Sequence, residues 1–359
     1  MLDKRAIGGS SYDWAVVGLS FWFLAGLVLD GWAHHHIREL ESFFTPWHAV
    51  FYSGFLAVAG LLMATLVRNH AKGSPWRQAM PPGYELSFLG VVIFVAGGLG
   101  DMIWHELFGI EARVEALLSP THLILALGGT LIMSGPFRAG WRRPSDQHNQ
   151  AKGWTALLPQ LLSLTFVLSL WSFMTQFVHP LVDPWAAAGF HPRSQDFPFL
   201  RQSLGVVSIL FQTGLLMGLV LLAVLRWLLP FGSVALVFAL NALFMSFMRD
   251  QYRFIPSAAL AGIVADLLLC WLRPSMGRSG ALRLFAFAVP VSYYAFYFAA
   301  LKVTQGLGWS VHLWTGSIVL AGVIGLLLSY LIIPPTHASL WLSPSSRTAE
   351  VSPNALLRR

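Results

Sequence analysis

Ten apolar runs, each long enough to cross a bilayer, recur along the whole chain and constrain its fold more than any other feature. An α-helix needs about 20 mostly apolar residues to span the hydrocarbon core of a membrane. Only 11% of the residues are charged, whereas soluble domains contain about 25%. We therefore predict an all-α, polytopic membrane helical bundle of about ten transmembrane helices. The predicted spans are 14–31, 46–67, 86–104, 119–137, 154–176, 201–226, 231–248, 254–272, 283–302 and 309–333.

The distribution of Lys and Arg predicts how these spans are oriented. Most of the 23 basic residues lie at the two termini and in the connections after the even-numbered spans. By the positive-inside rule, both termini of this multi-pass protein face the cytoplasm and the chain forms five outward-facing hairpins in the cell's inner (plasma) membrane. The net charge of +7 then reflects topology, so we predict the lipid bilayer and no nucleic acid as a partner.

The first two hairpins share a pattern of polar residues, which we interpret as an internal repeat. Each has D-x3-H, a short connection, and then E-x3-[S/T]-P-x-H at the start of the next apolar span. The residues are Asp30, His34, Glu41, Thr45, Pro46 and His48 in the first hairpin and Asp101, His105, Glu115, Ser119, Pro120 and His122 in the second.

The spacing of this pattern predicts that its carboxylate and imidazole groups meet. Residues four apart lie on one face of a helix, so Asp30 and His34 can reach the same point. Ser or Thr before Pro is typical of a helix start, which places the following histidine in the first helical turn. Two histidines and one carboxylate form a common site for copper, iron or zinc. We predict two metal sites near the outer face, formed by Asp30, His34 and His48 and by Asp101, His105 and His122.

Several neighbouring residues leave alternatives open. Glu41, Glu111 and Glu115 are candidate alternative ligands or partners that orient an imidazole. His35 and His36 point to other faces than His34, so we assign them to the connection. The competing interpretation of the whole pattern is a set of polar caps on helix ends, exposed to water and lipid headgroups.

At these residues the sequence resembles the C subunit of the copper membrane monooxygenases, the particulate methane and ammonia monooxygenases. That subunit has an Asp-x3-His at a helix end and Phe-Thr-Pro-x-His at the next helix start, matched here by Asp30, His34 and 44–48. A second element with Pro-x-His is matched by Asp101, His105 and 120–122, although the family has Asn where Asp101 stands. The resemblance covers about residues 20–135.

The resemblance implies two neighbouring copper sites and oxidation of a small apolar substrate by dioxygen. It also implies other membrane subunits and an external electron donor such as a quinol. We accordingly expect three regions: 1–145 with the duplicated metal-binding hairpins, 146–335 with further transmembrane hairpins, and 336–359 as a polar cytoplasmic tail. The region 146–335 has no counterpart in the resemblance.

Two features of the second half carry weaker hypotheses. The third outer segment contains His179, Asp183 and His191, and is either a solvated loop or a lid over the metal sites. Asp266 lies within an apolar span, where a carboxylate is either hydrogen-bonded for structure or part of a proton path.

Three functions remain open from the sequence. The first is a copper-dependent oxidoreductase of the monooxygenase type. The second is a metal transporter, delivery protein or sensor, and the third is a non-catalytic assembly subunit. The chain contains no Walker loop, no dinucleotide-binding fingerprint and no haem-attachment motif, and its one cysteine excludes an internal disulfide and thiolate clusters.

Overall fold

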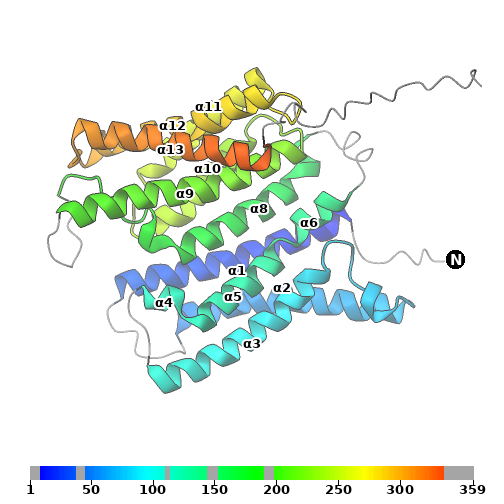
Figure 1. Cartoon of the computed structure of the whole chain (residues 1–359). Helices are drawn as coiled ribbons and strands as arrows, with labels where there is room; N and C mark the ends of the chain where they lie inside the picture. The colour runs from blue at the N-terminus through cyan, green and yellow to red at the C-terminus, as the bar shows by residue number, and fades with distance from the viewer. Residues whose placement is uncertain (1–8, 38–44, 110–113, 144–152, 190–197, 335–359) are drawn as a thin grey trace, which may run out of the picture.

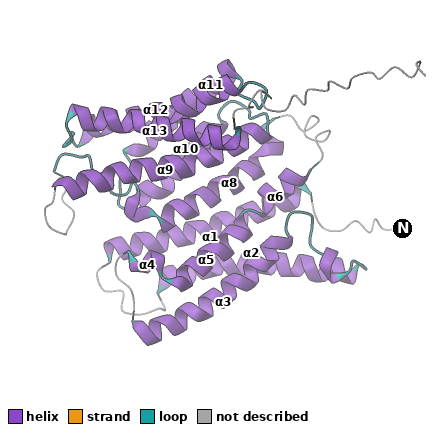
Figure 2. Ribbon diagram, viewed as in Figure 1, coloured by secondary structure: helices purple, strands orange, loops and turns teal. Residues whose placement is uncertain are grey.

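The computed structural model describes residues 9–37, 45–109, 114–143, 153–189 and 198–334. In these residues the regular structure is helical, as Figure 2 shows. The helices are α1 (Ser10–His36), α2 (Pro46–Ala71), α3 (Glu85–Phe108), α4 (Glu115–Leu118), α5 (Pro120–Met133), α6 (Gly135–Arg142), α8 (Trp154–Met174), α9 (Pro198–Arg226), α10 (Ser233–Phe247), α11 (Phe254–Leu272), α12 (Ser279–Thr304) and α13 (Val311–Ile332), with 3-10 helices at Trp76–Gln78 and Gln176–Val178.

Each predicted span corresponds to a helix. Eight of the described helices are long and apolar enough to cross a membrane, and α5 with α6 adds a ninth if the two are one bent span. The remaining predicted span, 231–248, is the 15-residue helix α10, which is apolar but shorter. The prediction of an all-α bundle with many membrane spans is therefore confirmed, while the number of ten stays a prediction.

Long helices lie side by side, with α1 beginning and α13 ending at the same end of the bundle (Figure 1). We call this the basic end, because the Lys and Arg residues at the ends of α2, α6, α9 and α11 lie there. Consecutive long helices α1 and α2, α3 and α5, α10 and α11, and α12 and α13 contact each other most extensively. The exception is α9: its contact with α13 is more extensive than its contact with α8, the helix that precedes it. In the centre, α8 contacts α1, α5, α6 and α10 and is the most buried candidate span.

Glycines bring the first two helices into close contact. A Cβ atom at Gly26 would lie 2.6 Å from the Cα of Phe51, and one at Gly54 would lie 2.6 Å from the Cα of Phe23. Small residues at such crossings allow helix backbones to approach in a membrane, where dispersion contacts replace the hydrophobic driving force. This crossing fixes the register of α1 against α2, and therefore the relative height of their ends opposite the basic end.

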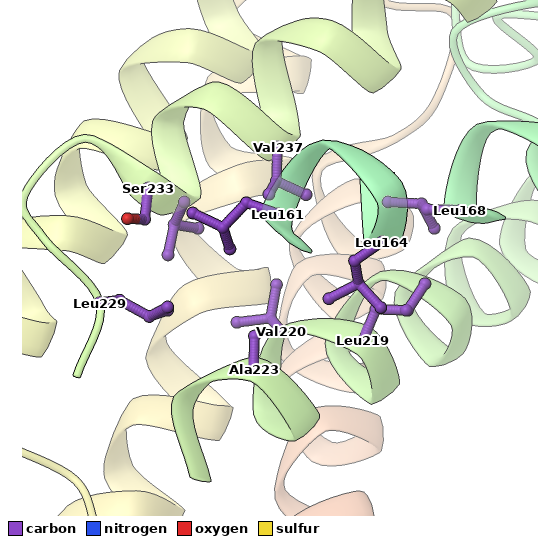
Figure 3. A pocket seen from close by; sticks show the side chains of 10 residues that line it. Leu161, Leu164, Leu168, Leu219, Val220, Ala223, Leu229, Ser233 and Val237 are labelled. Atoms are coloured by element: carbon purple, nitrogen blue, oxygen red, sulfur yellow. The ribbon is translucent and has the colours of Figure 1, made fainter. Parts of the chain in front are cut away.

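The core of the second half is tightly packed. A cavity of about 10 Å³ lies between α8, α9 and α10, which is room for about one water molecule. Figure 3 shows that its lining is almost entirely aliphatic, with Ser233 at its edge. Leu161, Leu164, Leu168, Leu219, Val220, Ala223, Leu229, Val234 and Val237 complete the lining. The cavity is too small and too apolar to bind an organic substrate.

Candidate metal centre

Four helix ends position the predicted ligands at the end of the bundle opposite the basic end (Figure 1). There α1 and α3 finish, and α2 and α5 begin. Asp30 and Asp101 lie one to two turns before the ends of α1 and α3, and both are buried, whereas His48 and His122 lie in the first turns of α2 and α5. The local signals of the sequence therefore place the ligands where the structure has them.

The first triad consists of Asp30, His34 and His48. The carboxylate oxygen Oδ2 of Asp30 lies 3.7 Å from Nε2 of His34, and Oδ1 lies 3.3 Å from Nδ1 of His48. The two imidazole rings are 6.0 Å apart and nearly perpendicular. One ligand atom from each residue lies within 4.8 Å of the others, so the group could hold a metal ion.

The second triad, Asp101, His105 and His122, has a similar arrangement. Oδ2 of Asp101 lies 3.4 Å from Nε2 of His105, and Oδ1 lies 3.3 Å from Nε2 of His122. The ring centroids are 5.8 Å apart, and the three ligand atoms again lie within 4.8 Å of one another. Each triad thus combines one carboxylate with two imidazoles, a donor set suited to copper, iron or zinc.

The residues that cap α2 and α5 also orient a histidine ring. The hydroxyl of Thr45 accepts the backbone N–H of His48 at 3.2 Å and lies 2.9 Å from Nδ1 of the same residue. In the same way, the hydroxyl of Ser119 accepts the backbone N–H of His122 at 3.4 Å and lies 2.8 Å from Nδ1 of that residue. In His122 this contact orients the opposite nitrogen, Nε2, toward Asp101. In His48 the hydroxyl of Thr45 and the carboxylate of Asp30 both lie near Nδ1. The capping hydroxyl therefore links the start of the helix to the pose of its ligand.

Two features distinguish the triads. His48 faces Asp30 with Nδ1, whereas His122 faces Asp101 with Nε2, and the residue before each of these histidines differs. Thr121 donates its hydroxyl proton to Oδ1 of Asp101 at 2.7 Å, and both side chains are buried. The corresponding position in the first hairpin is Trp47, which has no hydroxyl. Within the described residues, Oδ1 of Asp30 is buried and accepts no hydrogen bond. A buried carboxylate oxygen without a donor is costly unless a cation compensates it, so this triad fits a metal ion.

The two triads lie close enough to interact electrostatically. Asp101 lies within electrostatic range of His48, and His122 lies within electrostatic range of Asp30. Tyr52, one turn after His48, stacks on the His48 ring with centroids 6.2 Å apart and interacts with both carboxylates. Its hydroxyl would lie 3.7 Å from a Cβ at Gly98 of α3. Sequence analysis missed Tyr52, although its position four residues after His48 was a usable signal.

The other candidate residues lie elsewhere. Glu115 is exposed at the start of α4, outside both triads, and its role as an alternative ligand or orienting residue stays a prediction. Glu41 and Glu111 lie outside the described residues.

The residues we assigned to the first connection are in fact helical, since α1 continues through His36. His35 Nε2 lies 2.8 Å from Oε1 of Gln176, beyond α8. His36 Nε2 lies 2.9 Å from Oδ2 of Asp250, in the turn between α10 and α11. These two histidines thus connect the last turn of α1 to the second half of the bundle.

In the third outer segment, residues 179–187 are buried or half-buried, in contrast to a solvated loop, and residues 188 and 189 are exposed. His179 is 3% exposed, and desolvation lowers its pKa to about 3. Burial raises the pKa of Asp183, and the ion pair with Arg249 opposes that rise. His191 lies outside the described residues.

Asp266 has a structural environment. Its carboxylate accepts the backbone N–H groups of Val234 at 3.1 Å and of Ala235 at 3.0 Å. These are free donors at the start of α10, which an acceptor from α11 satisfies. The interaction ties two neighbouring helices together and accounts for a carboxylate inside an apolar span.

Comparison of the chain with family models, with curated proteins and with solved structures gives no match.

Proposed function

We propose that this membrane protein binds a metal ion at each triad, that the metal is copper, and that the pair of sites oxidises a small apolar substrate with dioxygen. The observation that carries the metal proposal is the pair of Asp/His/His groups, each with its ligand atoms within 4.8 Å of one another. The buried oxygen Oδ1 of Asp30 supports it further, because it accepts no hydrogen bond from the described residues and faces Nδ1 of His48 at 3.3 Å. Iron and zinc are the alternative metals for the same donors.

The residues of the chain have separable roles in this proposal. Asp30, His34 and His48 hold one ion, and Asp101, His105 and His122 hold the other. Thr45 and Ser119 orient the imidazoles of His48 and His122 through Nδ1, and Thr121 orients the carboxylate of Asp101. Copper, when bound, supplies the redox chemistry that activates dioxygen.

The choice of copper and of oxygen chemistry rests on the resemblance to the C subunit of the copper membrane monooxygenases. The location of the triads supports an apolar substrate, because they lie at the ends of helices apolar enough to span a bilayer. A substrate dissolved in lipid could reach such a site without crossing water. A quinol in the same bilayer is the proposed electron donor, and further membrane subunits are proposed partners. The sites would face outward and the termini inward.

The test is element analysis with electron paramagnetic resonance on the purified full chain after reconstitution with copper. We expect about two ions per chain, one for each triad. Asp30→Ala with His34→Ala should leave about one ion, as should Asp101→Ala with His105→Ala. His312→Ala is the matched control, because His312 lies in the first turn of α13, in neither triad.

Three outcomes would change the proposal. Failure of the wild type to bind copper would refute the copper sites. Bound copper without oxidation of small alkanes or ammonia by quinol and dioxygen would favour a non-catalytic assembly subunit. Copper uptake into proteoliposomes that disappears in Asp101→Ala and His122→Ala would favour a transporter or delivery protein.

A further inference from the structure

An open cavity of about 260 Å³ lies at the basic end, the opposite end of the bundle from the triads. Its lining comes from α6 and from the last part of α9. The lining residues are Phe137, Arg138, Trp141, Arg142 and Leu222, and we call this cavity the α6–α9 groove. The proposed metal function uses none of these residues.

The short helix α6 gives the groove both apolar and cationic walls. The chain bends by 42° between α5 and α6, at the sequence Ser134-Gly135-Pro136. Phe137 and Trp141 are four residues apart on α6, as are Arg138 and Arg142, so each pair shares a face. An amphipathic helix of this kind is typical of the boundary between hydrocarbon and headgroups.

Arginine side chains from both helices converge at the groove. The guanidinium of Arg226, at the end of α9, lies 5.2 Å from the centre of the Trp141 ring and donates to the Trp141 carbonyl. Among the described residues, its buried Nε has no hydrogen-bond acceptor. Arg138 is held in the wall by acceptors that include the carbonyl of Gly83 at 2.9 Å.

Among the residues that the structure describes, one carboxylate lies against these cations. Glu85 lies 2.7 Å from Arg142, and both side chains are about half exposed. Three guanidinium groups against one carboxylate leave an excess of positive charge. The groove is therefore suited to an anion, and the partly exposed side chains of Arg142 and Arg226 are the groups that can reach it.

The apolar part of the groove distinguishes a lipid from a soluble anion. Phe137, Trp141 and Trp227 form an aromatic cluster with centroids 5.5 to 5.8 Å apart. Aromatic residues gather at headgroup level in membrane proteins. Leu222 of α9 is 38% exposed and extends the wall in the direction of the membrane interior.

We propose that the α6–α9 groove binds an anionic phospholipid. Its phosphate lies between Arg142 and Arg226, and an acyl chain lies along Leu222. Basic pockets between transmembrane helices on the cytoplasmic side are suited to such headgroups, and the positive-inside pattern predicts that this end faces the cytoplasm. The site is independent of the triads, so it does not depend on the proposed metal function.

Native mass spectrometry of the delipidated full chain tests the proposal. Phosphatidylglycerol and phosphatidylcholine with identical acyl chains are added at equal concentrations. The wild type should bind phosphatidylglycerol more tightly. At about 1 kcal/mol for each cation, Arg226→Gln or Arg142→Gln should weaken that binding about five-fold, and the double variant about 25-fold. Phosphatidylcholine binding should weaken less, because its choline group offsets the charge of the phosphate.

Two controls separate charge from folding and location. Arg278→Gln removes an exposed arginine at the start of α12, outside the groove, and should leave binding unchanged. Arg226→Lys keeps the positive charge and should keep most of the preference for phosphatidylglycerol.

Any of three results would overturn the proposal. The first is equal binding of the two lipids by the wild type. The second is a loss of phosphatidylglycerol binding in Arg226→Lys, or in Arg278→Gln, that is as large as the loss in Arg226→Gln. The third is displacement of phosphatidylglycerol by inorganic phosphate at the lipid's own concentration and at constant ionic strength, which would show a site for a soluble anion.

Discussion

Thr121 compensates the buried carboxylate of Asp101, and replacing it with valine tests how much that compensation contributes to stability. Valine has nearly the shape of threonine but cannot donate a proton. Asp101 is 2% exposed and Thr121 is 8% exposed, so water cannot replace the lost 2.7 Å hydrogen bond. The variant also loses a 3.3 Å contact between the hydroxyls of Thr121 and Ser119.

A hydrogen bond to a charged group contributes about 1.5–3 kcal/mol. Without Thr121, Oδ1 of Asp101 keeps its 3.3 Å contact with Nε2 of His122 but loses its hydroxyl donor. We therefore expect Thr121→Val to lower the free energy of unfolding of the metal-free protein by about 1.5–3 kcal/mol. Adding copper should reduce the difference from wild type, because a bound cation compensates the same carboxylate. The assay is unfolding in mixed micelles, followed by circular dichroism with and without copper.

Thr165→Val is the matched control for this variant. Thr165 is fully buried in α8, but its hydroxyl donates to the carbonyl of Leu161, which already accepts a helix hydrogen bond. Its replacement should cost about 0.5 kcal/mol or less. If the metal-free Thr121→Val protein were as stable as wild type, or if Thr165→Val lost as much, the compensation argument would be wrong.

Two further variants test the helix crossing and the buried histidine. Gly54→Val should destabilise the protein by about 1–3 kcal/mol in the same unfolding assay, because its Cβ would lie 2.6 Å from the Cα of Phe23. A Cβ atom at Gly60, on the same helix, would have no neighbouring atom within 4 Å, so Gly60→Val should change the stability little. Equal losses of stability in the two variants would contradict the crossing argument. His179 stays neutral in the folded protein because desolvation lowers its pKa to about 3, whereas the unfolded chain takes up a proton below about pH 6.5. The contribution of His179 to stability is therefore fully present above about pH 6.5 and falls by about 2 kcal/mol by pH 5. The stability of His179→Gln should for this reason fall less than that of the wild type as the pH is lowered. An unchanged pH profile of stability would refute this.

Local sequence signals predicted the parts of the site that depend on neighbours along the chain. The spacing from Asp30 to His34 fixes a shared helix face, and Thr45 before Pro46 fixes a helix start. These rules need no knowledge of the tertiary structure. They were sufficient to identify both sets of three residues that the structure brings together.

Contacts between distant segments were not predictable in this way. The partner of His35 is Gln176, 141 residues away, and Arg249 reaches Asp183 across 66 residues. From local signals alone, His35 was therefore assigned to a connection, and a solvated third segment was one of the two interpretations left open. Thr121 lies inside the repeated pattern, but its bond to Asp101 depends on how α5 faces α3.

The last turn of α1 joins three parts of the molecule through consecutive residues. His34 faces Asp30, His35 contacts Gln176 and His36 contacts Asp250. Successive residues of an α-helix are rotated by about 100°. Inserting or deleting one residue between Asp30 and His34 would therefore turn all three side chains away from their partners at once. A substitution at His36 would remove one contact and leave the other two, so the length of α1 is constrained more tightly than the composition of its end.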